Sequence, residues 1–243
     1  MSEWLYGRNP TYEALRANRR KFFRLQVAQG AQKKGRLAEI IGLAHRSGLP
    51  VKFVPRHELD KIDRNHQGVA LQAGDYPYVG VTDILALASE RAEPPFLLVM
   101  DTLQDPQNLG TLLRTAEAVG VHGVLLPLAH TATITPAVVS SSSGASEHLL
   151  VVQTNLAQTL QILKEEDIWA IGLDGGSESQ PAERVNLKGG LALVVGSEGG
   201  GMRRLVRERC DILMRLPMRG QIESLNAAVA GSVALYLALA ARQ

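Results

Sequence analysis

Six continuous apolar runs, spaced regularly from residue 96 onward, constrain the fold of this chain more than any other feature. Their apolar residues are consecutive rather than alternating, and the runs are Phe96 to Met100, Gly123 to Pro127, Leu149 to Gln153, Trp169 to Leu173, Leu191 to Val195 and Ile212 to Leu216. Such runs are typical of parallel strands that are buried on both faces. Helix-like segments separate most of them, at 108–119, 135–142, 156–166 and 202–209. The pattern predicts a parallel α/β sheet with helices on both sides.

The first 73 residues show a different pattern, in which short predicted strands and helices alternate closely. We expect strands at 23–28, 51–54 and 69–71, and helices at 11–17, 33–47 and 57–62. We therefore divide the chain into a small α/β domain at 1–73, a linker with a helix at 74–95, and a larger α/β domain at 96–243.

Charge is distributed unevenly between these parts. Residues 1–73 contain 14 Lys and Arg against 6 Asp and Glu, whereas residues 74–243 contain 12 against 18, although the net charge of the chain is only +2. A basic first third indicates a part that binds a polyanion, and it favours nucleic acid over a solvated basic face without a partner.

Composition narrows the class of protein further. The most apolar stretch, 225–241, is short for a membrane span and contains Asn226 and Ser232, so no membrane partner is expected. The single cysteine, Cys210, excludes an intramolecular disulfide framework and indicates a cytoplasmic protein. The six histidines lack the spacing of metal ligands, and we expect no metal site.

Two broken strand ends lie close together near the carboxyl terminus. The run Leu191 to Val195 ends in the loop 196–201, which contains four glycines, and the run Ile212 to Leu216 is stopped by Pro217 and followed by Gly220. Glycine allows positive φ and the close approach of another molecule. Loops at the carboxyl ends of parallel strands form the ligand sites of open α/β sheets. We therefore expect a ligand here.

The glycine loop is not built for phosphate. It lacks the Lys-Ser/Thr ending of a P-loop, and its central Glu198 would repel an anion. No G-x-G-x-x-G pattern follows the run at 96–100, so a dinucleotide fold is not indicated. An acidic residue in a backbone-lined pocket favours a cationic ligand, and S-adenosylmethionine, a sulfonium with an adenosine body, meets this description. A tight turn without a ligand is the alternative.

Four polar residues, two of them after the run at 96–100 and two after the run at 212–216, each allow two interpretations. Asn108 either caps a helix or serves the site, and Arg114 either lies on the surface or points at a ligand. Ser224 can cap the helix expected at 227–240, whereas Asn226 needs partners if it is buried among apolar residues. That apolar helix is expected to pack on the sheet and on another chain. No histidine pairing with Ser224 is visible that would indicate a serine nucleophile.

Three segments together resemble the three motifs of the SpoU (TrmH-like) RNA 2′-O-ribose methyltransferases, in the SPOUT superfamily. They are Asp105-Pro106-Gln107-Asn108-Leu109-Gly110 through Arg114, Val195-Gly196-Ser197-Glu198-Gly199-Gly200-Gly201-Met202, and Leu216-Pro217-Met218-Arg219-Gly220 through Ser224-Leu225-Asn226. The amino-terminal part resembles the family's RNA-binding domain, which is related to a ribosomal-protein fold. The motifs that carry this resemblance are Tyr6-Gly7-Arg8-Asn9-Pro10 and His66-Gln67-Gly68. The resemblance covers nearly the whole chain. It is closest to bacterial members that methylate a guanosine ribose of 23S ribosomal RNA.

The resemblance implies a parallel α/β sheet whose carboxyl-terminal part is threaded into a deep trefoil knot, a rare exception among folds. It implies a homodimer that acts on RNA with S-adenosylmethionine as methyl donor and no metal. The implied donor-binding residues are Gly196, Leu216, Leu225, Ser197, Gly201 and Met218. The implied catalytic residues are Arg114, Asn108, Glu198, Ser224 and Asn226.

Two other functions remain open at this stage. A transfer-RNA methyltransferase of the same family would share the motifs, although such members often use short terminal helices in place of a full front domain. A non-catalytic RNA-binding or ribosome-assembly protein would share the fold, but it would not need the five catalytic residues. One departure from the family is visible, since Ser140 stands where relatives often have lysine ahead of Gly144-Ala145.

Overall fold

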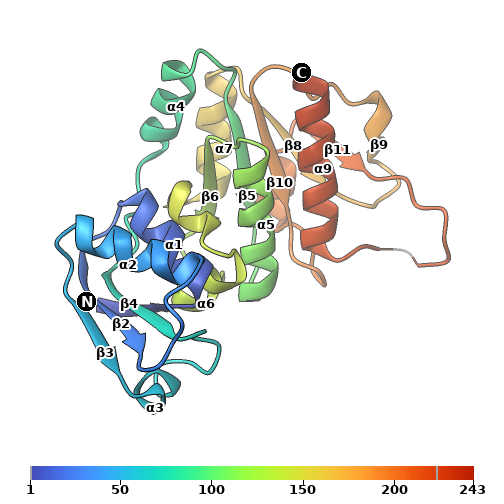
Figure 1. Cartoon of the computed structure of the whole chain (residues 1–243). Helices are drawn as coiled ribbons and strands as arrows, with labels where there is room; N and C mark the ends of the chain where they lie inside the picture. Colours follow the sequence, from blue (N-terminus) through green and yellow to red (C-terminus); the bar gives the residue numbers. More distant parts are fainter. Residues whose placement is uncertain (1, 223) are drawn as a thin grey trace. The chain divides into compact units, whose positions relative to one another are not determined.

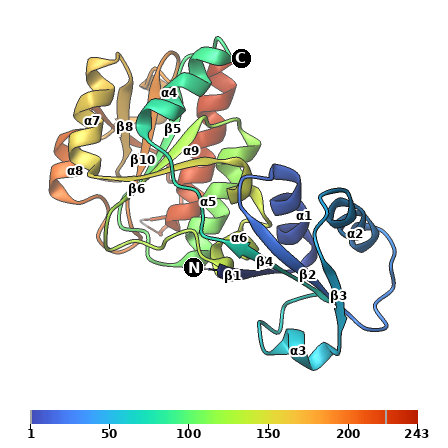
Figure 2. The same ribbon diagram turned by 90° about the vertical axis from the view of Figure 1, so that its left-hand side faces the viewer.

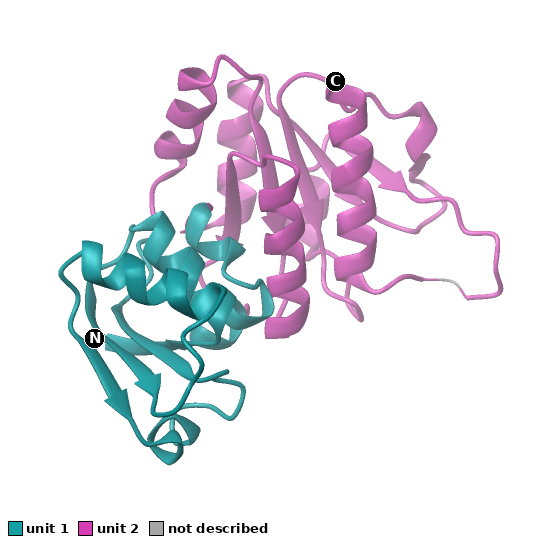
Figure 3. Cartoon of the chain, in the orientation of Figure 1, with its two compact units in different colours: residues 1–77, 134–148 teal, residues 78–133, 149–243 magenta. Residues whose placement is uncertain are grey.

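The chain forms two compact units in a computed structural model that describes residues 2–222 and 224–243. The first unit comprises residues up to 77 together with 134–148, and the second comprises 78–133 together with 149–243 (Figure 3). The division expected from the sequence differs from this, because it assigned 134–148 to the larger domain. In the structure this segment packs against the first helix and the first strand of the chain. Gly144 permits that contact, since a Cβ there would lie 2.7 Å from the Cβ of Glu13.

A four-stranded sheet forms the first unit, with strand order β1-β4-β2-β3. The strands are β1 (Ser2–Tyr6), β2 (Phe22–Ala28), β3 (Val51–Val54) and β4 (Val69–Gly74). β4 pairs antiparallel with both β1 and β2, and β2 pairs parallel with β3. The helices are α1 (Arg8–Ala17), α2 (Arg36–Arg46), α3 (Arg56–Asp60) and, from the returning segment, α6 (Pro136–Ser141) and the 3₁₀ helix η1 (Ala145–His148). Helices α1 and α2 lie on one side of the sheet and α3 lies on the other (Figure 2).

The second unit has a seven-stranded sheet of order β7-β6-β5-β10-β8-β11-β9, and every pair in it is parallel. Its strands are β5 (Phe96–Met100), β6 (Gly123–Pro127), β7 (Leu150–Thr154), β8 (Trp169–Leu173), β9 (Gln180–Pro181), β10 (Leu191–Val195) and β11 (Ile212–Arg215). Every residue of β5, β6 and β10 is buried. The predicted parallel α/β fold, preceded by a small α/β domain, is therefore confirmed.

Helices cover both faces of this second sheet (Figure 1). They are α4 (Val81–Glu90), α5 (Pro106–Ala118), α7 (Leu156–Glu165), α8 (Arg204–Glu208) and α9 (Ala227–Arg242), with the short 3₁₀ helix η2 (Ala182–Arg184). α4, α7 and α8 supply one apolar core, and α5 packs with α9 on the other face. Gly231 allows α9 to approach closely, because a Cβ there would lie 2.6 Å from Leu112.

The two front motifs meet at one end of the first unit. The backbone N–H of Arg8 donates to the side-chain oxygen of Gln67 at 3.0 Å, and the Arg8 Nε donates to the Gln67 carbonyl at 3.2 Å. His66 is fully buried and accepts from the Gly68 N–H at Nδ1, 2.8 Å away. Gly7 and Gly68 have φ of 90° and 85°, a region that glycine adopts without strain. Both motifs are therefore needed to close these turns.

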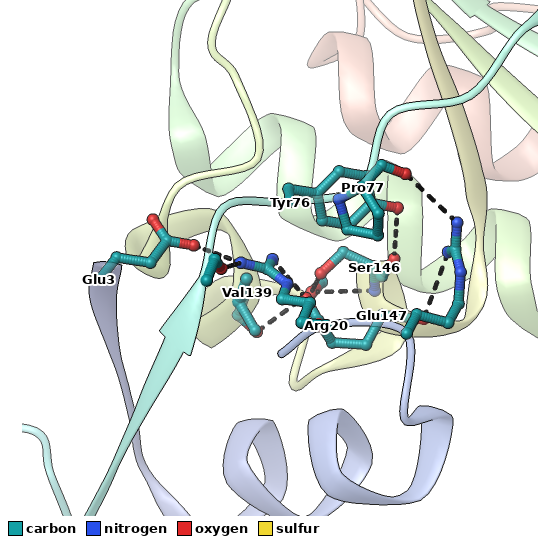
Figure 4. A network of polar contacts seen from close by, with 10 residues as sticks. Glu3, Arg20, Tyr76, Pro77, Val139, Ser146 and Glu147 are labelled. Atoms are coloured by element: carbon teal, nitrogen blue, oxygen red, sulfur yellow. Dashed lines mark hydrogen bonds and ion pairs between the residues drawn. The ribbon is translucent and has the colours of Figure 1, made fainter. Parts of the chain in front are cut away.

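A buried ion network holds the returning segment in the first unit (Figure 4). The Arg20 side chain is fully buried, and it donates to Glu147 of η1 at 2.7 Å and to Glu3 of β1. It also lies 4.8 Å from the ring centroid of Tyr76, whose hydroxyl donates to the Ser146 carbonyl at 2.9 Å. Burial raises the pKa of Glu147, although the Arg20 guanidinium opposes this shift. Because the network is desolvated, each charge depends on its partners.

Candidate functional site

The carboxyl ends of β8, β10 and β11 enclose a cavity of about 260 Å³ in the second unit. The segment before α9 completes its wall. Its lining residues are Leu173, Asp174, Gly175, Val195, Gly196, Ser197, Glu198, Gly201, Met214, Arg215, Leu216, Met218, Ser224, Leu225, Ala227 and Ala230. The cavity therefore lies where the broken strand ends predicted it.

The glycine loop is a tight hairpin. Ser197 and Gly201 exchange two backbone hydrogen bonds of 3.0 Å, and Gly201 has φ of 63°. A Cβ on Gly196 would lie 2.2 Å from the carbonyl carbon of Gly201, so only glycine fits at that position. The alternative of a tight turn is thus correct in shape, but the turn also forms one wall of a cavity. All six donor-binding candidates line that cavity: Gly196, Ser197, Gly201, Leu216, Met218 and Leu225.

Three of the five catalytic candidates form one hydrogen-bonded cluster. The Asn108 Nδ2 donates to Glu198 Oε1 at 2.9 Å. The Asn226 Nδ2 donates to the same carboxylate oxygen and to Asn108 Oδ1, the latter at 3.1 Å. These residues come from three separate segments, and Glu198 also lines the cavity. The cluster therefore fixes α5, the glycine loop and the start of α9 beside one another.

The structure corrects two capping assignments. Asn108 lies inside α5, whose N-cap is Asp105; the Asp105 carboxylate accepts from the Gln107 N–H at 3.1 Å. Ser224 does not cap α9, because Asn226 takes that place and its Oδ1 accepts from the Val229 N–H at 3.1 Å. Asn226 thus uses both ends of its amide, with the oxygen on the helix and the nitrogen on Glu198. The capping alternatives for Asn108 and Ser224 were wrong.

The remaining two candidates are placed differently. Ser224 lines the cavity and is exposed. Arg114 is exposed on α5, nearly two turns beyond Asn108, and is not one of the residues that line the cavity. The structure thus brings Ser224 to the cavity wall with the donor-binding candidates, while Arg114 lies on the same helix as Asn108.

Sequence reasoning missed one wall of the cavity, which follows β8. Asp174 there accepts hydrogen bonds from the Gly176 N–H at 2.7 Å and from Arg207 Nε at 2.9 Å. Burial raises the pKa of Asp174, but these hydrogen bonds outweigh it and hold the pKa below its ordinary value. The pair Gly175-Gly176, directly after a buried strand, was the sequence signal that could have indicated this wall.

A buried carboxylate anchors the other side of the glycine loop. Asp101, which follows β5 and is fully buried, accepts from both the backbone N–H and the Nε of Arg203 at 2.7 Å. Arg203 stands at the N-cap of α8, directly after the loop. This charged pair is stronger than a neutral hydrogen bond and fixes where the loop ends.

Candidate metal clusters and membrane-spanning helices were sought in the part of the chain that the structure describes. Within residues 2–222 and 224–243, no group of three or more His, Cys, Asp or Glu side chains is arranged to hold a metal ion. In the same ranges, no helix combines the length and the apolar character that crossing a bilayer requires.

Solved structures with the same fold are methyltransferases. The SpoU methyltransferase AviRb from Streptomyces viridochromogenes, in complex with the cofactor AdoMet, has a TM-score of 0.81 at 21% identity and covers 98% of this chain and 90% of its own. The AdoMet-bound rRNA methyltransferase from Sinorhizobium meliloti has a TM-score of 0.79 at 21% identity, with coverages of 98% and 86%. The A. aeolicus TrmH/SpoU tRNA modifying enzyme matches 61% of this chain and 75% of its own, with a TM-score of 0.55 at 24% identity. The fold is therefore that of the SPOUT methyltransferases.

Sequence comparison narrows this class. Residues 95–236 match the SpoU rRNA Methylase family, and residues 4–79 match the RNA 2′-O ribose methyltransferase substrate binding family. YacO of Bacillus subtilis (strain 168), assigned to the TrmH family of tRNA/rRNA methyltransferases, is 42% identical over 96% of this chain and 94% of its own length. The chain belongs to the SpoU rRNA Methylase family and is an RNA methyltransferase of the SpoU/TrmH type.

Proposed function

We propose that this protein transfers the methyl group of S-adenosylmethionine to a ribose 2′-hydroxyl of RNA. The observation that carries the proposal is the cavity at the carboxyl ends of the parallel strands, joined through Glu198 to a cluster of two asparagines. Family membership supports the reaction class, and the cavity is where we propose that the reaction takes place.

The cavity residues fit this methyl donor. Backbone at Gly196 and apolar side chains at Leu216, Met218 and Leu225 offer a flat, partly apolar wall for an adenosine body. Two carboxylates, Asp174 and Glu198, also line the cavity, and they suit a ligand that carries a sulfonium and an ammonium group. These residues would hold the donor, which supplies an electrophilic methyl group when it is bound.

Positioning is the main task left to the chain, because methyl transfer needs the attacking oxygen in line with the carbon–sulfur bond. Glu198, with both asparagine amides on one of its oxygens, fixes the wall of the cavity. Ser224 also lines the cavity, and its hydroxyl orients the ribose. In this mechanism the residues of the cluster act chiefly by holding the acceptor ribose still.

Arg114 binds the acceptor rather than removing its proton. A guanidinium stays protonated under all ordinary conditions, so it cannot serve as a general base. It is a bidentate donor for a phosphate and can polarise the 2′-oxygen at the same time. In this mechanism Arg114 holds the phosphate next to the modified ribose.

A ribosomal RNA, and specifically a guanosine of 23S ribosomal RNA, is the substrate that we propose. The solved tRNA modifying enzyme matches 61% of this chain, whereas the solved rRNA methyltransferase covers 98% of it, including the first unit. The basic first 73 residues add a surface for a polyanion. Transfer RNA is the alternative substrate, and the name of the Bacillus subtilis relative includes both.

A second copy of the chain is the proposed protein partner. The outward face of α9 carries a stripe of exposed apolar side chains, which are Val229, Val233, Tyr236 and Leu237. Their spacing puts them on one side of the helix, while the opposite side packs on α5. An apolar stripe of this kind favours a self-complementary dimer contact.

Incubation with tritiated S-adenosylmethionine tests the reaction. The purified protein is given 23S ribosomal RNA, 16S ribosomal RNA or total transfer RNA, and methylated nucleosides are identified after digestion. We expect 2′-O-methylguanosine from 23S ribosomal RNA alone. Label found in transfer RNA instead would mean that transfer RNA, and not 23S ribosomal RNA, is the substrate. Donor binding without methyl transfer to any RNA would favour a non-catalytic RNA-binding protein.

A further inference from the structure

A row of polar and aromatic side chains crosses one face of the sheet in the first unit. The strand register pairs Trp4 of β1 with Gln72 of β4, and Gln72 with Arg24 of β2. Residues paired across neighbouring strands share a face, so these three side chains lie side by side. On the same face, Lys52 of β3 is paired with Gln26, two residues beyond Arg24.

This face is only partly covered within the first unit. α1 and α2 lie on the opposite side of the sheet (Figure 2). α3 covers one end of the face, where Leu59 packs with a small apolar cluster: Ala28, Val54 and Ala70. Trp4 is half-buried and packs against the edge of that cluster, Gln72 is half-buried, and Arg24 and Lys52 are exposed. The row is therefore an open strip of sheet rather than core.

The strip is cationic, and in it a guanidinium group stacks on an aromatic ring. The Arg24 guanidinium lies 5.2 Å from the centroid of the Trp4 ring. Neither Arg24 nor Lys52 makes an ion pair with any residue in 2–222 or 224–243. The nearby acidic residue of β1, Glu3, alternates to the other face and is used by Arg20. The strip thus keeps two uncompensated positive charges, that of Lys52 and that of the Arg24 guanidinium stacked on Trp4.

We propose that this strip is a stacking platform for unpaired RNA, and the proposal rests on the function proposed above. A base stacks on the Arg24–Trp4 pair, since guanidinium and indole planes are both surfaces for a base. Gln72 reads a polar base edge, and Lys52 binds a backbone phosphate. A duplex cannot use the strip, because its bases are already stacked inside the helix. The platform therefore selects a single-stranded segment of the substrate.

Direct binding in the absence of methyl donor tests the platform. A fluorescein-labelled oligouridine of about ten nucleotides, within the usual site size, is titrated with the full chain at several salt concentrations. Trp4→Leu is expected to weaken binding roughly ten-fold with an unchanged salt slope, because stacking releases no counterions. Lys52→Gln is expected to reduce the slope of log K against log salt by about 0.7, the value for one phosphate contact on a single strand.

Two further variants keep the test independent of folding. Trp4→Phe retains an aromatic plane and is expected to bind nearly as well as the wild type. Arg46→Gln removes an exposed charge from α2, which lies on the other side of the sheet, and it is expected to leave both affinity and slope unchanged. Equal loss in Trp4→Leu and Trp4→Phe, or wild-type binding by Trp4→Leu, would overturn the proposal. A duplex bound as tightly as the single strand would overturn it as well.

Donor binding, measured by calorimetry on the same samples, separates this proposal from the proposed function. All of these variants are expected to bind S-adenosylmethionine as the wild type does. A wild type that binds the donor but no single-stranded RNA contradicts the platform alone. A wild type that binds neither contradicts the proposed function itself.

Discussion

At the scale of single residues, one carboxylate oxygen organises the cluster of catalytic candidates. Glu198 accepts from the amides of Asn108 and Asn226 on that oxygen, so both asparagines are oriented by a charged acceptor. Charge-assisted hydrogen bonds of this kind are roughly twice as strong as neutral ones. The asparagines are therefore held in place before any substrate arrives, which is what a positioning mechanism needs.

Replacement of Arg114 by lysine tests whether a planar, bidentate donor is required. Arg114→Lys keeps the positive charge but loses the fork of N–H groups that matches a phosphate. Loss of one charged hydrogen bond costs about 1.5–3 kcal/mol, so we expect kcat/KM for RNA to fall by about 10- to 150-fold. Affinity for S-adenosylmethionine, measured by calorimetry, is expected to stay at the wild-type value. Methylation by Arg114→Lys within about two-fold of the wild type would rule out the bidentate role.

His122 predicts a pH dependence of stability. Its side chain is buried, its Nδ1 accepts from the Phe96 N–H at 3.0 Å, and its Nε2 lies 3.0 Å from Glu93. Burial lowers the pKa of His122 below the ordinary histidine value of 6.5, and the Glu93 carboxylate opposes this only in part. The unfolded chain therefore binds the proton more readily than the folded chain. The contribution of His122 to stability is present above pH 6.5 and is lost as the pH falls below that value.

Urea unfolding between pH 5 and pH 8, a range of about three units around the ordinary histidine pKa, measures this dependence. His122→Asn can keep an acceptor for the Phe96 N–H but cannot take up the proton. We expect the free energy of unfolding to fall less steeply with acid in His122→Asn than in the wild type. Parallel pH profiles for the two proteins would show that another group carries the acid sensitivity.

At the scale of elements, the Arg20 network determines where residues 134–148 fold. Arg20 and Glu147 are both desolvated, so removing Arg20 leaves the buried Glu147 carboxylate without this partner, and removing Glu147 leaves the buried Arg20 guanidinium with Glu3 but without its buried partner. We expect Glu147→Gln or Arg20→Met to lower the stability of the first unit by about 3–5 kcal/mol. The double variant Arg20→Met/Glu147→Met removes both charges and is expected to recover part of this loss.

An exposed ion pair in the same unit is the matched control. Arg36 and Glu39 pair at 2.7 Å on α2 with half-exposed side chains, so Glu39→Gln is expected to cost about 0–1 kcal/mol. Unfolding of the first unit can be followed by Trp4 fluorescence in a Trp169→Phe background, because the chain has two tryptophans. Equal destabilisation by Glu39→Gln and Glu147→Gln would mean that the buried network contributes no more to the stability of the first unit than an exposed ion pair does.

Elements of the second unit could be predicted from the sequence because each one is determined by the apolar pattern within its own segment. Runs such as Leu191 to Val195 are continuous and apolar, and β10 has those same bounds. β1 was not predicted, because Ser2–Tyr6 becomes a strand only by pairing with β4, far along the chain. The packing of 134–148 on the first unit depends on equally distant contacts, and no local pattern indicates them.

The candidate site divides in the same way. Gly196, Glu198 and Leu216 could be found because broken strand ends are visible in the sequence, and all three line the cavity. The hydrogen bonds from Asn108 and Asn226 to one oxygen of Glu198 join residues that are 90 and 28 positions apart, so they needed the structure. The catalytic roles of these residues stay predictions, as does the trefoil knot that the family resemblance implies.

At the scale of the whole molecule, the exposed stripe on α9 predicts a dimer. Val233 and Tyr236 are 43% and 54% exposed near the middle of that stripe, with Val229 and Leu237 on either side. A charge placed there would be buried without a partner in a symmetric contact. We expect the wild type to sediment as a dimer and Val233→Asp to sediment as a folded monomer.

Ile162→Asp provides the matched control for the dimer. Ile162 is 50% exposed on α7, which covers the opposite face of the same sheet, so an aspartate there is expected to leave the dimer intact. Asn226, one of the catalytic candidates, is the N-cap of α9, so a dimer contact along this helix would begin close to it in the sequence. If the dimer contact supports the cluster, the monomeric Val233→Asp variant will also lose methylation activity. Its circular dichroism spectrum is expected to show that it is still folded. A monomeric Val233→Asp with full activity would show instead that one chain holds a complete site.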